Sequence, residues 1–116
     1  MTMDGFSNTP EPPYYAVIFT SVLGEDRHGY DAMGSALVAL AKRQPGYLGI
    51  ETTRGADGLG ITVSYWKDEE SILAWKQQTQ HLLAQKHGIE KWYNHYELRV
   101  AKVERAYNGP KGRSLG

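Results

Sequence analysis

Hydrophobic residues recur along the chain with two different periods. One stretch has them at helical spacing: Tyr30, Met33, Leu37 and Leu40. This spacing predicts an amphipathic helix over roughly residues 26–43, which ends before Pro45 and Gly46. Other stretches are dense in β-branched and aromatic residues, which is typical of strands. They predict strands at 14–22, 47–54 and 61–66, the last two joined by the glycine-rich turn GADGLG.

A second helix is predicted after the third strand. Asp68 is a favourable N-cap, and the two glutamates that follow it suit the positive end of the helix dipole. Ile72, Trp75 and Thr79 share one face of this helix, and Gly88 is expected to end it.

The last alternation of apolar and polar residues begins at Trp92 and predicts a long strand. One face of that strand would carry Trp92, Tyr96, Leu98 and Val100, and the other Tyr93, His95, Glu97 and Arg99. The predicted order is therefore β-α-β-β-α-β. This order is typical of the ferredoxin-like α+β fold, an antiparallel sheet with two helices on one face.

The predicted sheet is apolar on both faces. In the first strand, Ala16 and Ile18 point one way, and Val17 and Phe19 the other. Two helices can cover only one of these faces, so a monomer would expose large apolar side chains to water. We therefore expect a symmetric homodimer in which the uncovered faces meet.

Composition narrows the class of protein further. Thirteen basic and thirteen acidic residues give a net charge of zero, so no nucleic-acid or anionic-membrane surface is indicated. The absence of cysteine excludes disulfides and thiolate chemistry. No secretory signal or membrane-spanning run is recognised, and we expect a cytoplasmic protein. Residues 1–13 and 108–116 are rich in proline, glycine and polar residues, and we expect them to be disordered ends of one domain at 14–107.

The residues alone leave the chemistry open. Trp75 is explained equally by packing of the second helix on the sheet and by the wall of a ligand pocket, because buried indoles serve both purposes. His81 and Gln85 are neighbours on that helix, but one His without a second His or carboxylate at helical spacing is weak evidence for a metal site, and none is predicted.

Several segments resemble the antibiotic biosynthesis monooxygenase superfamily: YYAVIFTS, PGYLGIETTRGADGLGITVSYWKDEESILAWK, HLLAQKHG and WYNHYELRVAKVERAY. The resemblance covers Tyr14 to Tyr107. It implies a dimeric α+β barrel, the architecture that the two-faced sheet also indicates. It further implies a monooxygenase that oxidises an aromatic polyketide or quinol without metal or flavin, with the electron-rich substrate itself activating oxygen.

The same superfamily includes haem-degrading enzymes, whose signature is an Asn on the first strand, a Trp on the second helix and a His later on that helix. Trp75 matches this signature, whereas Ser21 and Gln85 stand where the Asn and His would be. Haem as a ligand or substrate is therefore an alternative. A dimeric module that binds an aromatic metabolite without turning it over is another.

The resemblance implies a pocket between the sheet and the second helix of each protomer. We expect a small aromatic or quinol-like compound to bind there without a cofactor, against an aromatic wall formed by Trp75, Phe19 and Tyr93. Ser21 and Gln85 are the expected hydrogen-bonding residues. His81 is the expected proton acceptor, since imidazole exchanges protons near neutral pH. Catalysis is thus assigned to His81, Trp75 and Ser21, and substrate binding to Phe19, Trp75, Gln85 and Tyr93.

Overall fold

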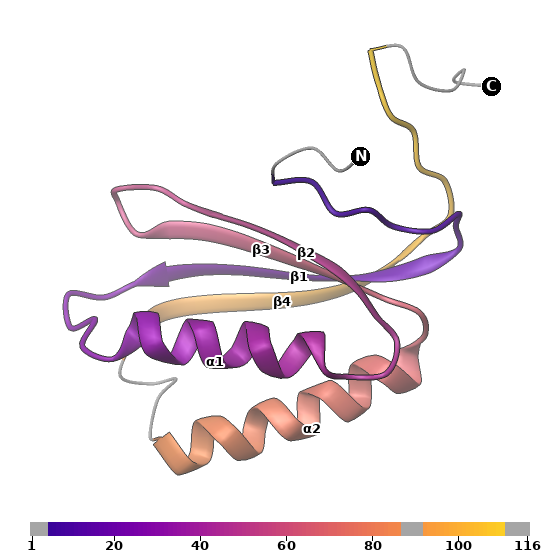
Figure 1. Cartoon of the computed structure of the whole chain (residues 1–116). Helices are drawn as coiled ribbons and strands as arrows, with labels where there is room; N and C mark the ends of the chain where they lie inside the picture. The colour runs from indigo at the N-terminus through magenta and orange to yellow at the C-terminus, as the bar shows by residue number, and fades with distance from the viewer. Residues whose placement is uncertain (1–4, 87–91, 111–116) are drawn as a thin grey trace.

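The computed structural model describes residues 5–86 and 92–110, with side chains as far as Leu82 in the second helix. The elements follow the predicted order: β1 (Tyr14–Leu23), α1 (Tyr30–Lys42), β2 (Tyr47–Arg54), β3 (Leu59–Trp66), α2 (Glu69–Lys86) and β4 (Tyr93–Val103). Both helices lie on the same side of the sheet (Figure 1). The ferredoxin-like α+β fold predicted from the sequence is confirmed.

The sheet is antiparallel and four-stranded, in the order β2-β3-β1-β4. Its register aligns one row of residues across all the strands: Arg54, Gly60, Ser21 and Tyr96. Since residues directly opposite one another share a face, this register decides which side chains meet beneath the helices.

The start of α1 differs from the prediction. The helix begins at Tyr30, four residues after the expected start at Asp26. The Asp26 carboxylate accepts a hydrogen bond from the His28 backbone N–H at 3.1 Å, which forms a local turn. Gly29 then adopts a φ of 81°, a left-handed conformation that a helix interior does not contain. Asp68, by contrast, caps α2 as predicted, accepting the Ser71 backbone N–H at 2.8 Å.

The alternation predicted for β4 is wrong at Tyr93. Tyr93 lies opposite Leu23 and His95 lies opposite Val22, so the register shifts between them. A bulge of this kind places two residues of one strand against one of the other. Tyr93 consequently lies on the helix-covered face, with its ring centroid 5.3 Å from that of Phe19.

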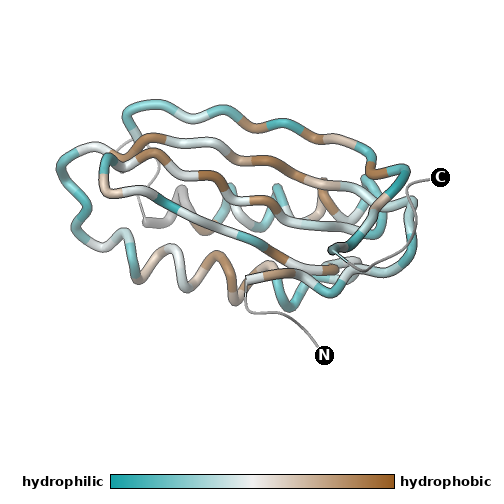
Figure 2. Tube along the Cα trace, turned by 90° about the horizontal axis from the view of Figure 1, so that it is seen from above, coloured by the Kyte–Doolittle hydropathy of each residue, from teal (hydrophilic) through white to brown (hydrophobic). Residues whose placement is uncertain are grey.

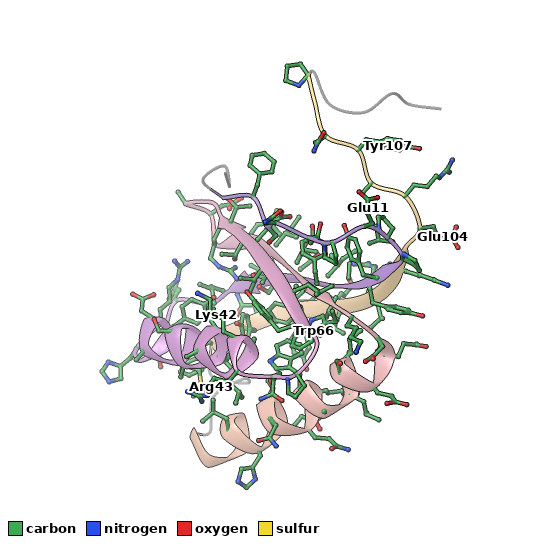
Figure 3. The ribbon with its side chains drawn as sticks, turned by 45° about the vertical axis from the view of Figure 1, so that its right-hand side comes forward. Glu11, Lys42, Arg43, Trp66, Glu104 and Tyr107 are labelled. Atoms are coloured by element: carbon green, nitrogen blue, oxygen red, sulfur yellow. The ribbon has the colours of Figure 1, made fainter. Side chains whose placement is uncertain are left out.

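The core between the sheet and the helices is divided in two. The first core cluster contains Val17, Ala41, Trp66 and Ile72, with Trp75 packed against it. The second core cluster contains Leu23, Met33 and Trp92, with Tyr30, Leu82 and Tyr93 packed against it. Figure 3 shows Trp66 between the sheet and the helices, and its side chain is fully buried. Phe19 and Ser21 occupy the part of β1 between the two clusters.

The opposite side of the sheet, which we term the open face, is not covered by helices. Its central positions, paired across β1 and β3, are Ile18, Thr20, Val22, Leu59, Ile61 and Val63. Figure 2 looks onto this face and shows hydrophobic positions along the strands. Leu59 and Ile61 are 48% and 43% exposed.

The segment 5–13, expected as a mobile arm, lies on the open-face side of the sheet (Figure 1). The Ser7 backbone N–H donates to the Glu51 carboxylate at 2.9 Å, and the Ser7 hydroxyl donates to the Ile50 carbonyl at 3.1 Å. The arm thus contacts one end of the open face near Tyr14, which Thr9 hydrogen-bonds at 3.0 Å.

Candidate functional site

A strip of polar groups separates the two core clusters on the helix-covered face. On β1 the interval between Val17 and Leu23 contains Ser21, whose residue is only 1% exposed. On α2 the interval between Trp75 and Leu82 contains Thr79. Each of these two elements thus contacts both clusters and places a buried hydroxyl group between the two contacts. We call Ser21, Arg54, Trp75 and Thr79 the interior polar strip.

Arg54 enters the strip from the end of β2. Its guanidinium donates to the Ser21 hydroxyl at 2.7 Å and to the Ser21 carbonyl at 3.2 Å, and also to the Gly58 carbonyl. To reach β1 the side chain crosses Gly60 of β3, where an added Cβ would lie 2.6 Å from Arg54 Cζ. A glycine at position 60 is therefore what permits an arginine of β2 to reach the central strand.

Aromatic rings surround the guanidinium. Arg54 Cζ lies 5.7 Å from the centroid of the Tyr30 ring, and Arg54 Nη2 donates to the Tyr30 hydroxyl at 3.3 Å. Tyr93 packs edge-on against Tyr30, with ring centroids 6.0 Å apart. Burial, together with a hydrogen bond to Tyr30, raises the pKa of Tyr93 well above its ordinary value. Tyr93 is therefore a neutral hydroxyl at physiological pH and not a phenolate base.

Arg54 has no carboxylate partner among the described side chains. The ion pairs found there join Glu97 to His95 and to Arg99, on the other face of the sheet. The partners of Arg54 are carbonyls and hydroxyls, which do not cancel its charge. A half-buried cation with neutral partners favours binding of an anion, because that replaces the lost hydration and neutralises the charge.

Trp75 and Thr79 complete the strip from α2. Residues four apart lie on one helix face, and both polar groups are turned away from solvent. Trp75 Nε1 and Thr79 Oγ1 are buried and make no hydrogen bond within the described part of the chain. The neighbouring Trp66, whose ring centroid is 5.0 Å from that of Trp75, differs: its Nε1 donates to Ser64 Oγ at 2.9 Å.

The structure brings together part of the site expected from the sequence. Phe19 and Ser21 lie between the two core clusters, and Tyr93 packs against Phe19 from the second cluster. Trp75 stands at the first cluster. The strand register of β1 and β4 and the helical period of α2 explain this grouping. They turn each of these side chains towards the layer between the sheet and the helices.

His81 is not part of that group, and the side chain of Gln85 lies outside the described residues. His81 is exposed and lines a groove of about 320 Å³ between α1 and α2, with Ala36, Ala39, Leu40, Arg43, Gln78 and Leu82. Gln85 belongs to the last turn of α2, beyond the residues whose side chains are described.

Arg54 and Tyr30 were not predicted as site residues from the sequence. Arg54 was assigned only to the end of a strand, because the turn that follows it leaves the hairpin register open. Once the register is known, Arg54 can be recognised as a site residue, because it pairs with Gly60 and Gly60 pairs with Ser21. Tyr30 was assigned to the apolar stripe of α1, which it does join through the second core cluster.

Comparison with known proteins agrees with this architecture. The family model described as antibiotic biosynthesis monooxygenase matches residues 13–87. The uncharacterized protein YqjZ of Bacillus subtilis (strain 168) is 52% identical over 103 residues, covering 89% of this chain and 90% of that protein. The chain belongs to the antibiotic biosynthesis monooxygenase family.

Solved structures share the fold at low sequence identity. SnoaB, a cofactor-independent oxygenase from Streptomyces nogalater, has a TM-score of 0.68 at 12% identity, covering 82% of this chain and 97% of that one. PA3566 from Pseudomonas aeruginosa has a TM-score of 0.63 at 18% identity, covering 84% of this chain and 98% of that one. None of the described helices is long and apolar enough to cross a lipid bilayer.

Proposed function

We propose that the protein is a cofactor-independent monooxygenase that oxidises a small aromatic, quinol-like compound bound as an anion at Arg54. The observation that carries the proposal is the half-buried guanidinium of Arg54, which has no carboxylate partner in the described structure and lies against the Tyr30 ring. Family membership and the fold shared with a cofactor-independent oxygenase support the reaction type.

The proposed chemistry follows from holding the substrate as a phenolate. Arg54 favours the ionised form of a phenol, since a neighbouring positive charge lowers the pKa of that hydroxyl. The electron-rich ring then reduces O2 and forms a carbon–oxygen bond at a ring carbon that bears hydrogen. Cleavage of the oxygen–oxygen bond leaves one oxygen as a quinone carbonyl and releases the other as water with the phenol and ring hydrogens. The substrate supplies all the electrons.

The remaining residues of the site bind and orient the substrate. Phe19 and Tyr93, with ring centroids 5.3 Å apart, offer apolar surface to an aromatic ring. Ser21 fixes the guanidinium through its hydroxyl. Helices on one side and the sheet on the other restrict access of water, which strengthens the interaction between Arg54 and an oxyanion.

We further propose that the active protein is a homodimer in which two open faces pack together. Leu59 and Ile61 are large, apolar and exposed on β3, one of the two central strands of that face. A second copy of the same surface would bury them symmetrically.

Oxygen consumption tests the proposed reaction. Wild-type protein, Arg54→Gln and Arg54→Lys are compared on a panel of naphthols and hydroquinones with a metal chelator present. Arg43→Gln, which removes an exposed arginine next to α1, is the matched control. We expect uptake above the spontaneous rate for at least one phenol, reduced about tenfold or more in Arg54→Gln and unchanged in Arg43→Gln.

Two outcomes would replace this function with an alternative. Saturable binding of an aromatic anion without oxygen uptake on any compound would indicate a binding module. A saturable Soret shift with hemin, followed by loss of the band with ascorbate in the presence of catalase, would indicate haem degradation.

A further inference from the structure

The arm at residues 5–13 lies over the open face and not beside it. Gly49 pairs with Tyr65 and Tyr65 pairs with Ala16, so these three positions share that face. A Cβ added at Gly49 would lie 2.6 Å from both Cβ and Oγ of Ser7, which places Ser7 directly above the sheet. The arm can approach β2 this closely because Gly49 has no side chain.

Hydrogen bonds at two arm residues fix the path of the arm. The Ser7 backbone N–H and the Tyr65 hydroxyl both donate to the Glu51 carboxylate, at 2.9 and 2.6 Å. Thr9 hydrogen-bonds Tyr14, which is only 4% exposed although the described helices lie on the other side of the sheet. Each chain thus covers one end of its own open face with its arm and leaves the other end exposed.

Exposure alternates along the arm. Ser7 and Thr9 are half-buried against the sheet. Phe6, Asn8 and Pro10 are exposed. This alternation is typical of an extended chain, in which successive side chains point to opposite sides. The arm therefore holds Phe6, which is 67% exposed, on the side from which a second open face would approach.

Holding Phe6 in this position is unfavourable for a single chain. Ordering the arm costs conformational entropy, and the cost per residue is of the same order as the net gain from one hydrogen bond. Burial of apolar surface would offset that cost, but Phe6 contributes little while it is exposed to water. A second copy packed on the open face would bury the ring, and it would bury both copies of it, because a two-fold interface uses the same surface of each chain.

We propose that the arm is part of the dimer interface and that Phe6 is its anchor, which packs on the open face of the second copy. The inference rests on the proposed function, because it takes up the dimer proposed there. The partner is a second copy because Phe6 stands on the same side of the sheet as the exposed Leu59 and Ile61. Aromatic side chains are also enriched at protein interfaces. The family model matches from residue 13 onwards, so the arm lies outside the matched region.

Subunit exchange measures the contribution of Phe6 even where the dimer is too tight to dissociate on dilution. Isotope-labelled and unlabelled protein are mixed, and native mass spectrometry follows formation of the mixed dimer. Phe6→Ser should exchange about tenfold faster or more than the wild-type protein, because both copies of the ring lose their apolar contacts. Leu73→Ser removes an exposed leucine of α2, on the other side of the sheet, and should exchange at the wild-type rate.

Gly49→Ala tests the path of the arm without changing the sequence of the arm. The added methyl group would displace Ser7, so this variant should also exchange faster although it retains Phe6. Exchange at the wild-type rate in either variant would contradict the anchor, and slower exchange would show that the arm obstructs the face. In both cases, loss of the dimer in Ile61→Lys would leave the proposed dimer standing. A monomeric wild-type protein would overturn the dimer and the anchor together.

Discussion

At the scale of single residues, the site depends on a glycine as much as on the arginine that it admits. Gly60 stands between Arg54 and Ser21 in the register of the sheet. Because Gly60 has no side chain, the Arg54 side chain has room to cross β3. Neither residue has any distinguishing feature in the sequence, because their relation exists only after β2, β3 and β1 pair.

Gly60→Ala should therefore weaken ligand binding in the same way as a substitution of Arg54. The added methyl group would lie 2.6 Å from Arg54 Cζ and displace the guanidinium from Ser21. We expect binding of 2-naphthoate to fall about as far as in Arg54→Gln, measured by calorimetry. Gly34→Ala is the matched control, since an added Cβ there meets nothing within 4 Å and α1 should gain about 0.5–1 kcal/mol of stability. Unchanged binding by Gly60→Ala would contradict the crossing.

Trp66 and Trp75 should respond differently to the same substitution. Trp66→Phe leaves the Ser64 hydroxyl, only 3% exposed, without its partner, which should cost about 1–3 kcal/mol in the free energy of unfolding. Trp75→Phe removes an N–H that has no partner in the described structure, so the free energy of unfolding should fall by less than in Trp66→Phe. Urea denaturation of the two variants measures the difference. A larger loss in Trp75→Phe would show that its N–H is satisfied within the fold.

At the scale of elements, periodicity and residue type predicted the helices and strands that the structure describes, but they could not predict the irregularities of these elements. β2 was predicted at the bounds observed, because Pro45, Gly46 and the GADGLG turn punctuate it at both ends. The start of α1 and the face of Tyr93 were missed, since each depends on one local feature: a left-handed glycine and a bulge. Phe19, Ser21 and Trp75 were placed correctly on the helix-covered side because they follow their element's period.

The cap of α2 gives a pH-dependent prediction. Hydrogen bonds from the Ser71 hydroxyl and backbone N–H lower the pKa of the Asp68 carboxyl. The ionised carboxylate therefore stabilises α2 above the unfolded-state pKa, and this contribution is lost as pH falls through the folded-state pKa. Asp68→Ala should lower the thermal midpoint at neutral pH, and its difference from the wild-type protein should shrink in acid. Asp68→Asn, which keeps a cap without a titrating group, should show no such convergence with Asp68→Ala.

At the scale of the whole molecule, the sheet separates the proposed ligand site from the proposed dimer surface. The helix-covered face contains the interior polar strip, and the open face presents exposed apolar side chains on its central strands. The sequence predicted this division from apolar alternation on both faces. It could not predict the arm at 5–13, whose hydrogen bonds through Ser7 use partners that only the folded sheet brings together.

Charge on the open face should prevent self-association. Ile61→Lys places a cation at a position that the proposed dimer would bury, and burial of an unpaired charge is strongly unfavourable. Light scattering should give the mass of two chains for the wild-type protein and of one for Ile61→Lys. Leu73→Lys changes an exposed leucine of α2, on the other side of the sheet, and should leave the dimer intact. A dimer that survives Ile61→Lys but not Leu73→Lys would place the interface on the helices.

Binding of an aromatic anion at Arg54 is measured by titrating 2-naphthoate and the neutral 2-naphthamide into the wild-type protein and Arg54→Gln. The two ligands differ in charge and hardly in shape. We expect the wild-type protein to bind the naphthoate about tenfold or more tightly than the amide, and Arg54→Gln to abolish this preference. Equal affinities in the wild-type protein, or a preference that persists without Arg54, would show that Arg54 does not bind the anion.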